Sequence, residues 1–207
     1  AIVLDDSQET PPALDWLFDP GGRGHGGGHI PAVFIGEVDR DGVGNEASLG
    51  YSFGWMSNFR NCAEVLEAGK KHRDYDLHRD FPRLKKMYAA PYRLTALDKY
   101  TPRIGDTGRT ADPGMIQVNL DVTLDAFLRF GDPYFAQLAY KLNGNTADNL
   151  HGSIFHKDPE SIQQDIKKIV DSQGPLELDT ANLNGYGLAH FRNRPGGQSK
   201  SGLALLR

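Results

Sequence analysis

The sequence predicts a mainly α-helical chain that changes to antiparallel β-structure before its last residue. Apolar residues recur at intervals of three and four through most of the chain, which is typical of helices with one buried face. The connections between several of these segments are short, which favours antiparallel neighbouring helices. After Pro175 the apolar period becomes that of strands, and a run of turn residues separates two similar short segments, as in a hairpin.

The helical segments carry recognisable start and stop signals. The first has two prolines near its first turn and stops before Pro20. Another pattern starts near Asp80, and Pro91 is expected to kink it or divide it into two helices. That first helix spans residues 10–18, and the other predicted helices span residues 52–70, 120–130, 133–142 and 158–174.

Two strands are predicted near the end, at residues 185–192 and 201–207, around the turn Pro195-Gly196-Gly197. An isolated hairpin is marginal in water, so we expect this pair to belong to a larger sheet. The predicted domains are therefore a helical portion, residues 1–175, and the start of a β domain, residues 176–207. The segment 203–206 also reads as an interrupted strand, and we expect that Ala1 and Arg207 are not the natural ends.

Composition limits the classes of function. The 207 residues carry a net charge of −4 with a pI near 6.0 and a mean hydropathy of −0.50, values typical of a soluble globular protein. They give no general reason to bind nucleic acid or an anionic membrane, and no apolar run approaches the roughly 20 residues that span a bilayer. The single cysteine, Cys62, excludes an intrachain disulfide, and its helical spacing from Leu66 favours a buried thiol over a nucleophile.

The richest candidate site is the polar, glycine-rich run at residues 39–55, DRDGVGNEASLGYSFGW. Glycines let a backbone approach a ligand closely, and Asn45 and Glu46 can donate and accept hydrogen bonds beside the phenol of Tyr51. An ordinary glycine-rich turn before a helix explains the same residue types, because turns favour Gly, Asn, Asp and Ser. From the residues alone, both interpretations stay open.

Two other loops are candidates. The segment YTPRIGDTGR at residues 100–109 is too rich in Gly and Pro for regular structure and carries Arg103 and Asp106. Upstream, two histidines stand among four glycines at residues 23–29. Holding a metal on such a loop costs much conformational entropy, so a mobile loop beside a substrate is the favoured interpretation.

Taken together, four motifs resemble the heparinase II/III-like polysaccharide lyases, which include exolytic alginate lyases. In chain order they are LDD (4–6), DRDGVGNE (39–46) leading to GY (50–51), IGDTG (104–108) and GYGLA (185–189). The resemblance implies part of an incomplete (α/α) toroid followed by the first strands of an antiparallel β-sandwich. It also implies a lyase that cleaves a polysaccharide containing uronic acid by β-elimination, in the periplasm or after secretion.

By this resemblance Tyr51 is the proton-transferring catalytic residue, while two catalytic histidines of the family fall outside the sequence. Asn45, Glu46, Trp55, Arg103 and Asp106 are expected to bind the acidic sugar, although core packing explains Trp55 equally well. No cofactor is expected, but a structural divalent metal is conceivable in the rest of the sheet domain. The expected partners are the acidic polysaccharide or oligosaccharide and the remainder of the parent polypeptide, with no nucleic acid and no membrane.

Two alternatives remain beside the lyase. A glycoside hydrolase on the same kind of toroid would use Asp41 and Glu46 as its acid and base. A glycan-binding helical module would have no catalytic residues at all. The histidines at positions 151, 156 and 190 are more typical of surface or structural residues and receive no role.

Overall fold

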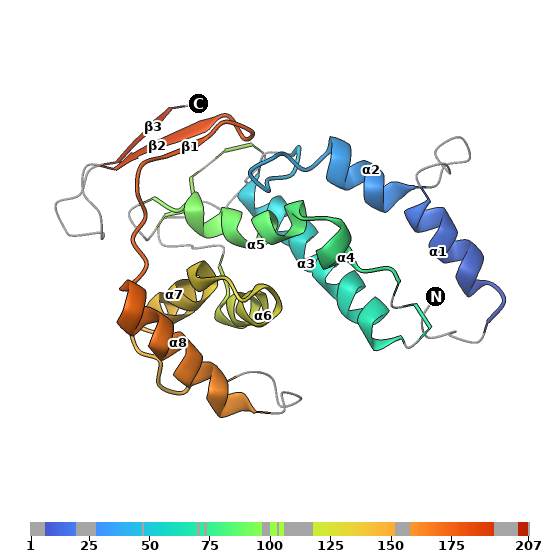
Figure 1. Cartoon of the computed structure of the whole chain (residues 1–207). Coiled ribbons are helices and arrows are strands. Elements are labelled where there is room, and N and C mark those ends of the chain that lie inside the picture. Colours follow the sequence, from blue (N-terminus) through green and yellow to red (C-terminus); the bar gives the residue numbers. More distant parts are fainter. Residues whose placement is uncertain are drawn as a thin grey trace. The chain divides into compact units, whose positions relative to one another are not determined.

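The computed structural model confirms a mainly helical chain with a small antiparallel sheet (Figure 1). It describes residues 7–19, 28–46, 48–69, 71–72, 74–96, 100–102, 104–105, 118–151, 158–192 and 203–206. The helices are α1 (Thr10–Phe18), α2 (His29–Gly36), α3 (Leu49–Ala68), α4 (Leu77–Asp80), α5 (Arg83–Arg93), α6 (Leu120–Phe130), α7 (Pro133–Leu142) and α8 (Pro159–Gln173). The strands are β1 (Ala181–Leu183), β2 (Leu188–Arg192) and β3 (Leu203–Leu206).

Short polar side chains fix the predicted starts of the last three helices. Asn119 accepts hydrogen bonds from the first backbone N–H groups of α6, Asp132 does so for α7, and Asp158 does so for α8. These caps satisfy donors that have no partner inside a helix. Gly131 ends α6 in the left-handed conformation, with φ of 59°. The predicted helices at 120–130, 133–142 and 158–174 are therefore confirmed almost to the residue.

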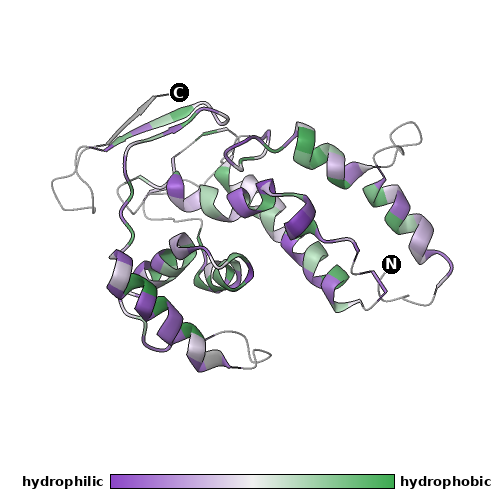
Figure 2. Ribbon diagram, in the orientation of Figure 1, coloured by the Kyte–Doolittle hydropathy of each residue, from purple (hydrophilic) through white to green (hydrophobic). Residues whose placement is uncertain are grey.

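Three predictions for the first half need correction. His29 does not lie in a loop but begins α2, a mostly apolar helix (Figure 2). The sequence did not predict this helix because HIPAVFIG lacks an amphipathic period. The pattern expected from Asp80 is two elements, the short helix α4 and then α5 from Arg83. Pro91 does not divide α5, which continues to Arg93, and the alternative of a kink at Pro91 stays a prediction.

The described contacts fall into two compact units, and each is best considered by itself. The first unit contains the described residues up to 90, with Pro102, Ile104, Gly105 and the turn Leu183–Gly187. The second contains Pro91–Thr101 together with α6, α7, α8, β2 and β3. The domain boundary expected near residue 175 stays a prediction.

Aromatic packing and one arginine organise the first unit. Phe34 on α2 stacks on Phe81, with ring centroids 4.6 Å apart, and also contacts Phe59 on α3 at 4.4 Å. The guanidinium of Arg83 donates to the carbonyl oxygens of Phe34, Ile35 and Val38. Because the carbonyls at a helix end lack intrahelical partners, this side chain closes the end of α2.

In the second unit α6 packs against α7 and α7 against α8 (Figure 1). Tyr92, Leu138 and Leu176 are buried together in its core. The sheet has the order β1-β2-β3, and β2 pairs antiparallel with β3, placing Ala189 opposite Leu206. The predicted hairpin is confirmed, whereas β1, only three residues long, was not predicted. Among the described residues, no helix combines the length and apolar character needed to cross a membrane.

Candidate functional site

The loop before α3 is a closed turn held by Asp39. Val38 and Gly44 form an antiparallel bridge, and the backbone N–H of Asp39 donates to the carbonyl of Val43 at 2.9 Å. The carboxylate of Asp39 accepts from the backbone N–H groups of Asp41 at 2.7 Å and Val43 at 3.1 Å. A short Asp side chain that binds its own backbone is typical of a fixed turn.

Gly42 brings this loop against the backbone of α5. Its φ is +91°, and a Cβ placed there would lie 2.4 Å from the carbonyl carbon of Lys86. The Lys86 ammonium in turn donates to the carbonyl oxygen of Arg40 at 2.7 Å. Only glycine fits both the conformation and the space, so Gly42 provides the positive φ and the close approach to α5.

Asp41 attaches the same loop to the hairpin turn between β1 and β2. Its Oδ2 accepts from the backbone N–H groups of Gly185 at 2.7 Å and Tyr186 at 3.2 Å. Gly185 leaves no room for a side chain, because a Cβ there would lie 2.5 Å from the Arg40 side chain. With its carboxylate held by two backbone donors, Asp41 is poorly placed to serve as the acid or base of a hydrolase.

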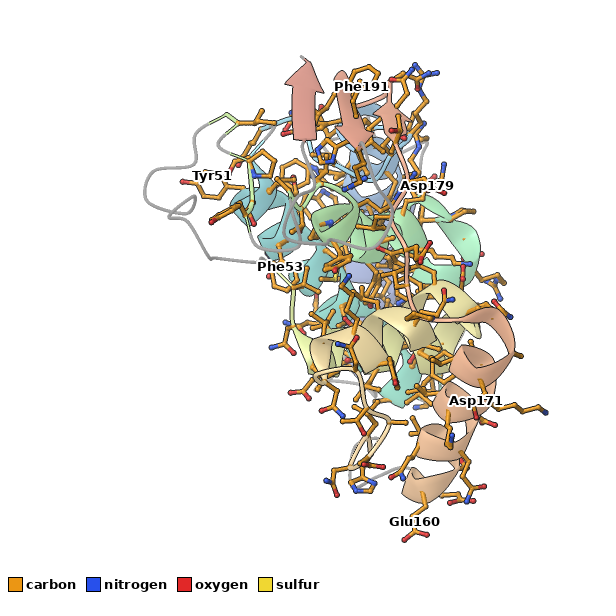
Figure 3. All side chains as sticks on the ribbon, turned by 90° about the vertical axis from the view of Figure 1, so that its left-hand side faces the viewer. Tyr51, Phe53, Glu160, Asp171, Asp179 and Phe191 are labelled. Atoms are coloured by element: carbon orange, nitrogen blue, oxygen red, sulfur yellow. The ribbon has the colours of Figure 1, made fainter. Side chains whose placement is uncertain are left out.

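Tyr51 lies in the first turn of α3 and is 49% exposed, with its ring projecting from the ribbon (Figure 3). One residue later, buried Ser52 accepts a hydrogen bond from the backbone N–H of Gly44 at 3.1 Å. The ring of Trp55 covers Gly44, where a Cβ would be 3.2 Å from the indole. The half-buried Trp55 therefore supports the loop, and its contact with sugar stays a prediction.

Asn45 and Glu46 are exposed at the end of the loop, and Asn45 donates through its amide to the carboxylate of Glu37. The structure thus brings Asn45, Glu46, Tyr51 and Trp55 into one local region through the loop and the first turns of α3. The two predicted binding residues Arg103 and Asp106 lie outside the described residues, as do His25 and His156.

Other titratable side chains have mostly structural surroundings. Cys62 is half-buried rather than fully buried as expected. Its burial raises the pKa of the thiol, which makes it a weaker nucleophile at neutral pH. Burial also raises the pKa of Tyr134 well above its ordinary range. His151 is exposed.

His190 on β2 is fully buried, which fits the structural role that was one of the two interpretations of its sequence. Its Nδ1 lies 3.2 Å from Nη2 of Arg192, and its Nε2 has no hydrogen-bond partner among the described residues. Burial, followed by the charge of Arg192, lowers its pKa to about 4. The ring is therefore neutral at physiological pH.

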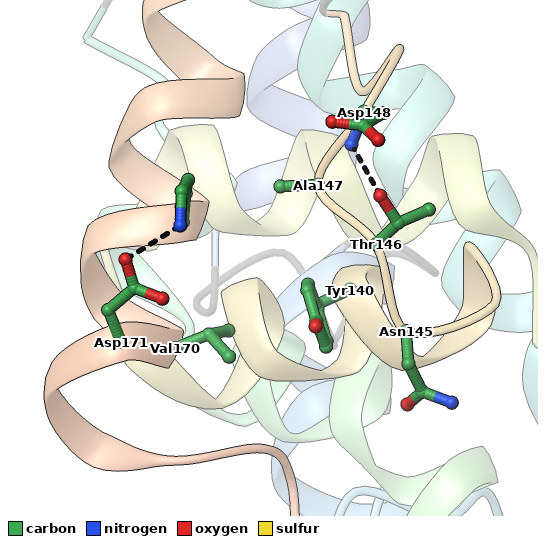
Figure 4. A pocket seen from close by; sticks show the side chains of 8 residues that line it. Tyr140, Asn145, Thr146, Ala147, Asp148, Val170 and Asp171 are labelled. Atoms are coloured by element: carbon green, nitrogen blue, oxygen red, sulfur yellow. Dashed lines mark hydrogen bonds and ion pairs between the residues drawn. The ribbon is translucent and has the colours of Figure 1, made fainter.

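A pocket of about 150 Å³ opens in the second unit, between the end of α7 and α8 (Figure 4). It is lined by Tyr140, Asn145, Thr146, Ala147, Asp148, Lys167, Val170 and Asp171. The ammonium nitrogen of Lys167 lies 2.9 Å from Oδ2 of Asp171, and the two exposed side chains form an ion pair. None of the residues predicted to form a site lines this pocket.

Sequence reasoning missed a cluster in the first unit formed by Glu67, Asp76 and His78, whose ligand atoms lie within 4.8 Å of one another. The only sequence signal is the spacing Asp76-Leu77-His78, which is too common to predict a site. Glu67 joins the pair because the chain turns between α3 and α4, and no periodicity in the sequence reveals that turn.

The comparisons with known proteins give no relative: no family model, no curated protein and no solved structure matches the chain. The site must therefore be judged from its own chemistry. It offers a half-exposed phenol, an amide and a carboxylate on a loop that is fixed at several points. Such a set can exchange a proton with a ligand and bind a carboxylate or hydroxyl groups.

Proposed function

We propose that the chain is part of a polysaccharide lyase that cleaves uronic-acid-containing polysaccharides or oligosaccharides by β-elimination. The motif resemblance to the heparinase II/III-like lyases is the source of this proposal. In the same proposal the helices belong to an incomplete (α/α) toroid and the strands begin a β-sandwich. The enzyme acts in the periplasm or outside the cell, and the reaction requires no cofactor.

The observation that carries the proposal is the setting of Tyr51. Its ring is 49% exposed, yet it stands on the first turn of a 20-residue helix, beside a loop anchored by Asp39 and Asp41. A catalytic phenol must be accessible to its substrate. The half-exposed ring of Tyr51 meets this requirement, and the motif resemblance assigns it the reactive role.

The elimination needs a residue that removes a proton and then supplies one. A base takes the proton from C5 of the uronate, the C5–H electrons form the C4=C5 double bond, and the C4–O bond to the leaving sugar breaks. The leaving oxygen then takes a proton. A phenolate at Tyr51 can accept the first proton and, as a phenol, return it to the neighbouring oxygen.

Neutralisation of the uronate carboxylate makes the C5 proton acidic, so donors are required at that group. In this proposal the amide of Asn45 donates to that carboxylate, and Glu46 binds sugar hydroxyls or shares a proton with the carboxylate. Arg103 contributes a bidentate charge and Asp106 holds a hydroxyl in the same proposal. The two further histidines implied by the resemblance complete the site.

Product chemistry distinguishes this proposal from its alternatives. A polypeptide carrying this chain with its flanking sequence is incubated with alginate oligosaccharides, and a neutral cello-oligosaccharide serves as control. Elimination gives products whose masses sum to that of the substrate and a conjugated uronate that absorbs ultraviolet light. Products that contain one added water would establish hydrolysis instead, and tight binding without any product would establish a binding module.

A further inference from the structure

We propose that Glu67, Asp76 and His78 bind a divalent transition-metal ion of the Zn²⁺ class at the junction of α3 and α4. Glu67 stands at the end of α3, Asp76 is the N-cap of α4 and His78 lies in its first turn. Nδ1 of His78 is 3.5 Å from Oε1 of Glu67, and a ligand atom of Asp76 lies within 4.8 Å of both.

The imidazole is oriented from its other side by a tyrosine. Nε2 of His78 lies 3.3 Å from the hydroxyl of Tyr88, a buried residue of α5. The His78 side chain is only 10% exposed, while Glu67 remains 44% exposed at the entrance. Metal-binding histidines characteristically engage the remaining ring nitrogen in a hydrogen bond, which fixes the tautomer and the ring plane. The arrangement around His78 has this form.

The distance between His78 and Glu67 fits two ligands of one metal ion better than a direct hydrogen bond between the two side chains. Ligands at about 2.0–2.2 Å from Zn²⁺ in a tetrahedron are separated by about 3.3–3.6 Å. The separation of 3.5 Å between His78 and Glu67 falls in this range but is long for a charge-assisted hydrogen bond. Oδ1 of Asp76 also accepts from the backbone N–H of Arg79 at 3.0 Å, and a carboxylate has a second oxygen that can bind an ion.

The donor set determines the class of ion. One imidazole nitrogen and two carboxylate oxygens suit Zn²⁺ and its neighbours, whereas Ca²⁺ and Mg²⁺ prefer oxygen ligands in larger numbers. Two carboxylates and a neutral imidazole also balance the charge of a divalent cation. Three protein ligands leave a fourth position for water.

The position of the site argues for stabilisation rather than a part in the proposed reaction. Glu67 follows Tyr51 by sixteen residues on the same helix, which corresponds to about 24 Å at about 1.5 Å per residue. A bound ion would join the end of α3 to the start of α4. The inference is therefore independent of the lyase proposal and can be tested without any substrate.

The test is Zn²⁺ binding by the full chain after treatment with a chelator, measured by competition with a chromophoric indicator and by thermal unfolding. We expect one ion per chain and a rise of several degrees in Tm at saturating Zn²⁺, with no rise in Mg²⁺. Glu67→Gln should weaken Zn²⁺ binding at least about tenfold, and Tyr88→Phe, which keeps the packing, about tenfold. Co²⁺ should give the intense visible absorption of a tetrahedral site.

Glu64→Gln is the matched control, because Glu64 lies one turn earlier on α3 and pairs with Arg60 at 2.9 Å. It should bind Zn²⁺ as the wild type does. Absence of a stoichiometric ion in the folded wild type would overturn the proposal. Equal affinities for wild type, Glu67→Gln and Tyr88→Phe would also overturn it, since the ion would then be held by other histidines.

Discussion

Gly42 shows how one missing side chain sets the geometry of the candidate site. The space for its Cβ is occupied by backbone atoms of Lys86 and Met87, at 2.4–2.6 Å, and its φ is +91°. Backbone atoms of a packed helix cannot move aside as the end of a flexible side chain can. The loop that carries Asn45 therefore depends on glycine at this position.

Gly42→Ala should lower the free energy of unfolding by about 2–4 kcal/mol, because it combines a strained backbone with a clash. Urea unfolding followed by tryptophan fluorescence provides the measurement. Gly54→Ala is the control: a Cβ at Gly54, in the middle of α3, meets no atom within 4 Å. That variant should gain about 0.5–1 kcal/mol from helix propensity. Equal effects of the two substitutions would contradict the described packing.

His190 makes the stability of the folded chain depend on pH. Its pKa falls from 6.5 to about 4 on folding, so the unfolded chain binds the proton first as the pH is lowered. Stability contributed by the neutral ring is complete above pH 6.5 and is lost as the pH falls toward 4. The loss reaches about 3 kcal/mol at most.

The measurement is the free energy of unfolding of wild type and His190→Gln at a series of pH values between 7 and 4. The difference between the two proteins should change across this range, with the wild type losing more stability, while acidic groups common to both cancel. A difference that stays constant with pH would show that His190 is not buried as a neutral ring.

At the scale of elements, the loop before α3 and the hairpin turn before β2 hold each other. Asp41 accepts from two backbone N–H groups of that turn, and Gly185 allows the close approach. The two segments lie 144 residues apart in sequence. The turn between two strands thus contributes to the position of the loop that bears the candidate binding residues.

Asp41→Ala removes both hydrogen bonds and leaves the two N–H groups without this acceptor. We expect a loss of about 1–3 kcal/mol in unfolding free energy, measured by urea unfolding. The exposed neighbour Glu46 supplies the control, since Glu46→Ala should change stability by no more than about 0.5 kcal/mol. If the two hydrogen bonds of Asp41 contribute nothing to stability, both variants will have the unfolding free energy of the wild type.

The elements also show what local sequence can predict. The helices α6, α7 and α8 carry an amphipathic period and a side-chain cap, so the sequence was sufficient to place them. The helix α2 has neither signal, and tertiary contacts such as Arg83 with its last carbonyls stabilise it. Pro91 lies inside α5, two residues before its end, and of the expected kink or division only the division is wrong.

At the scale of the whole molecule, the sequence predicted a mainly helical chain with a hairpin and placed the loop and Tyr51 together. It could not predict which carboxylate would be used structurally. Asp41 and Glu46 looked alike as candidate acids, and only the distant hairpin turn distinguishes them. The cluster of Glu67, Asp76 and His78 likewise arises from a chain turn without a sequence signature.

The central claim is that Tyr51 transfers the proton in β-elimination, and Tyr51→Phe tests it most directly. The turnover of alginate oligosaccharides is followed through the ultraviolet absorbance of the unsaturated product, in a polypeptide that includes the flanking sequence. Because the substitution removes only the hydroxyl group from a half-exposed ring, the fold should remain unchanged by circular dichroism. If Tyr51 transfers the proton, kcat should fall by about a hundred- to ten-thousandfold. A folded Tyr51→Phe variant that retains more than about a tenth of wild-type kcat would contradict this claim.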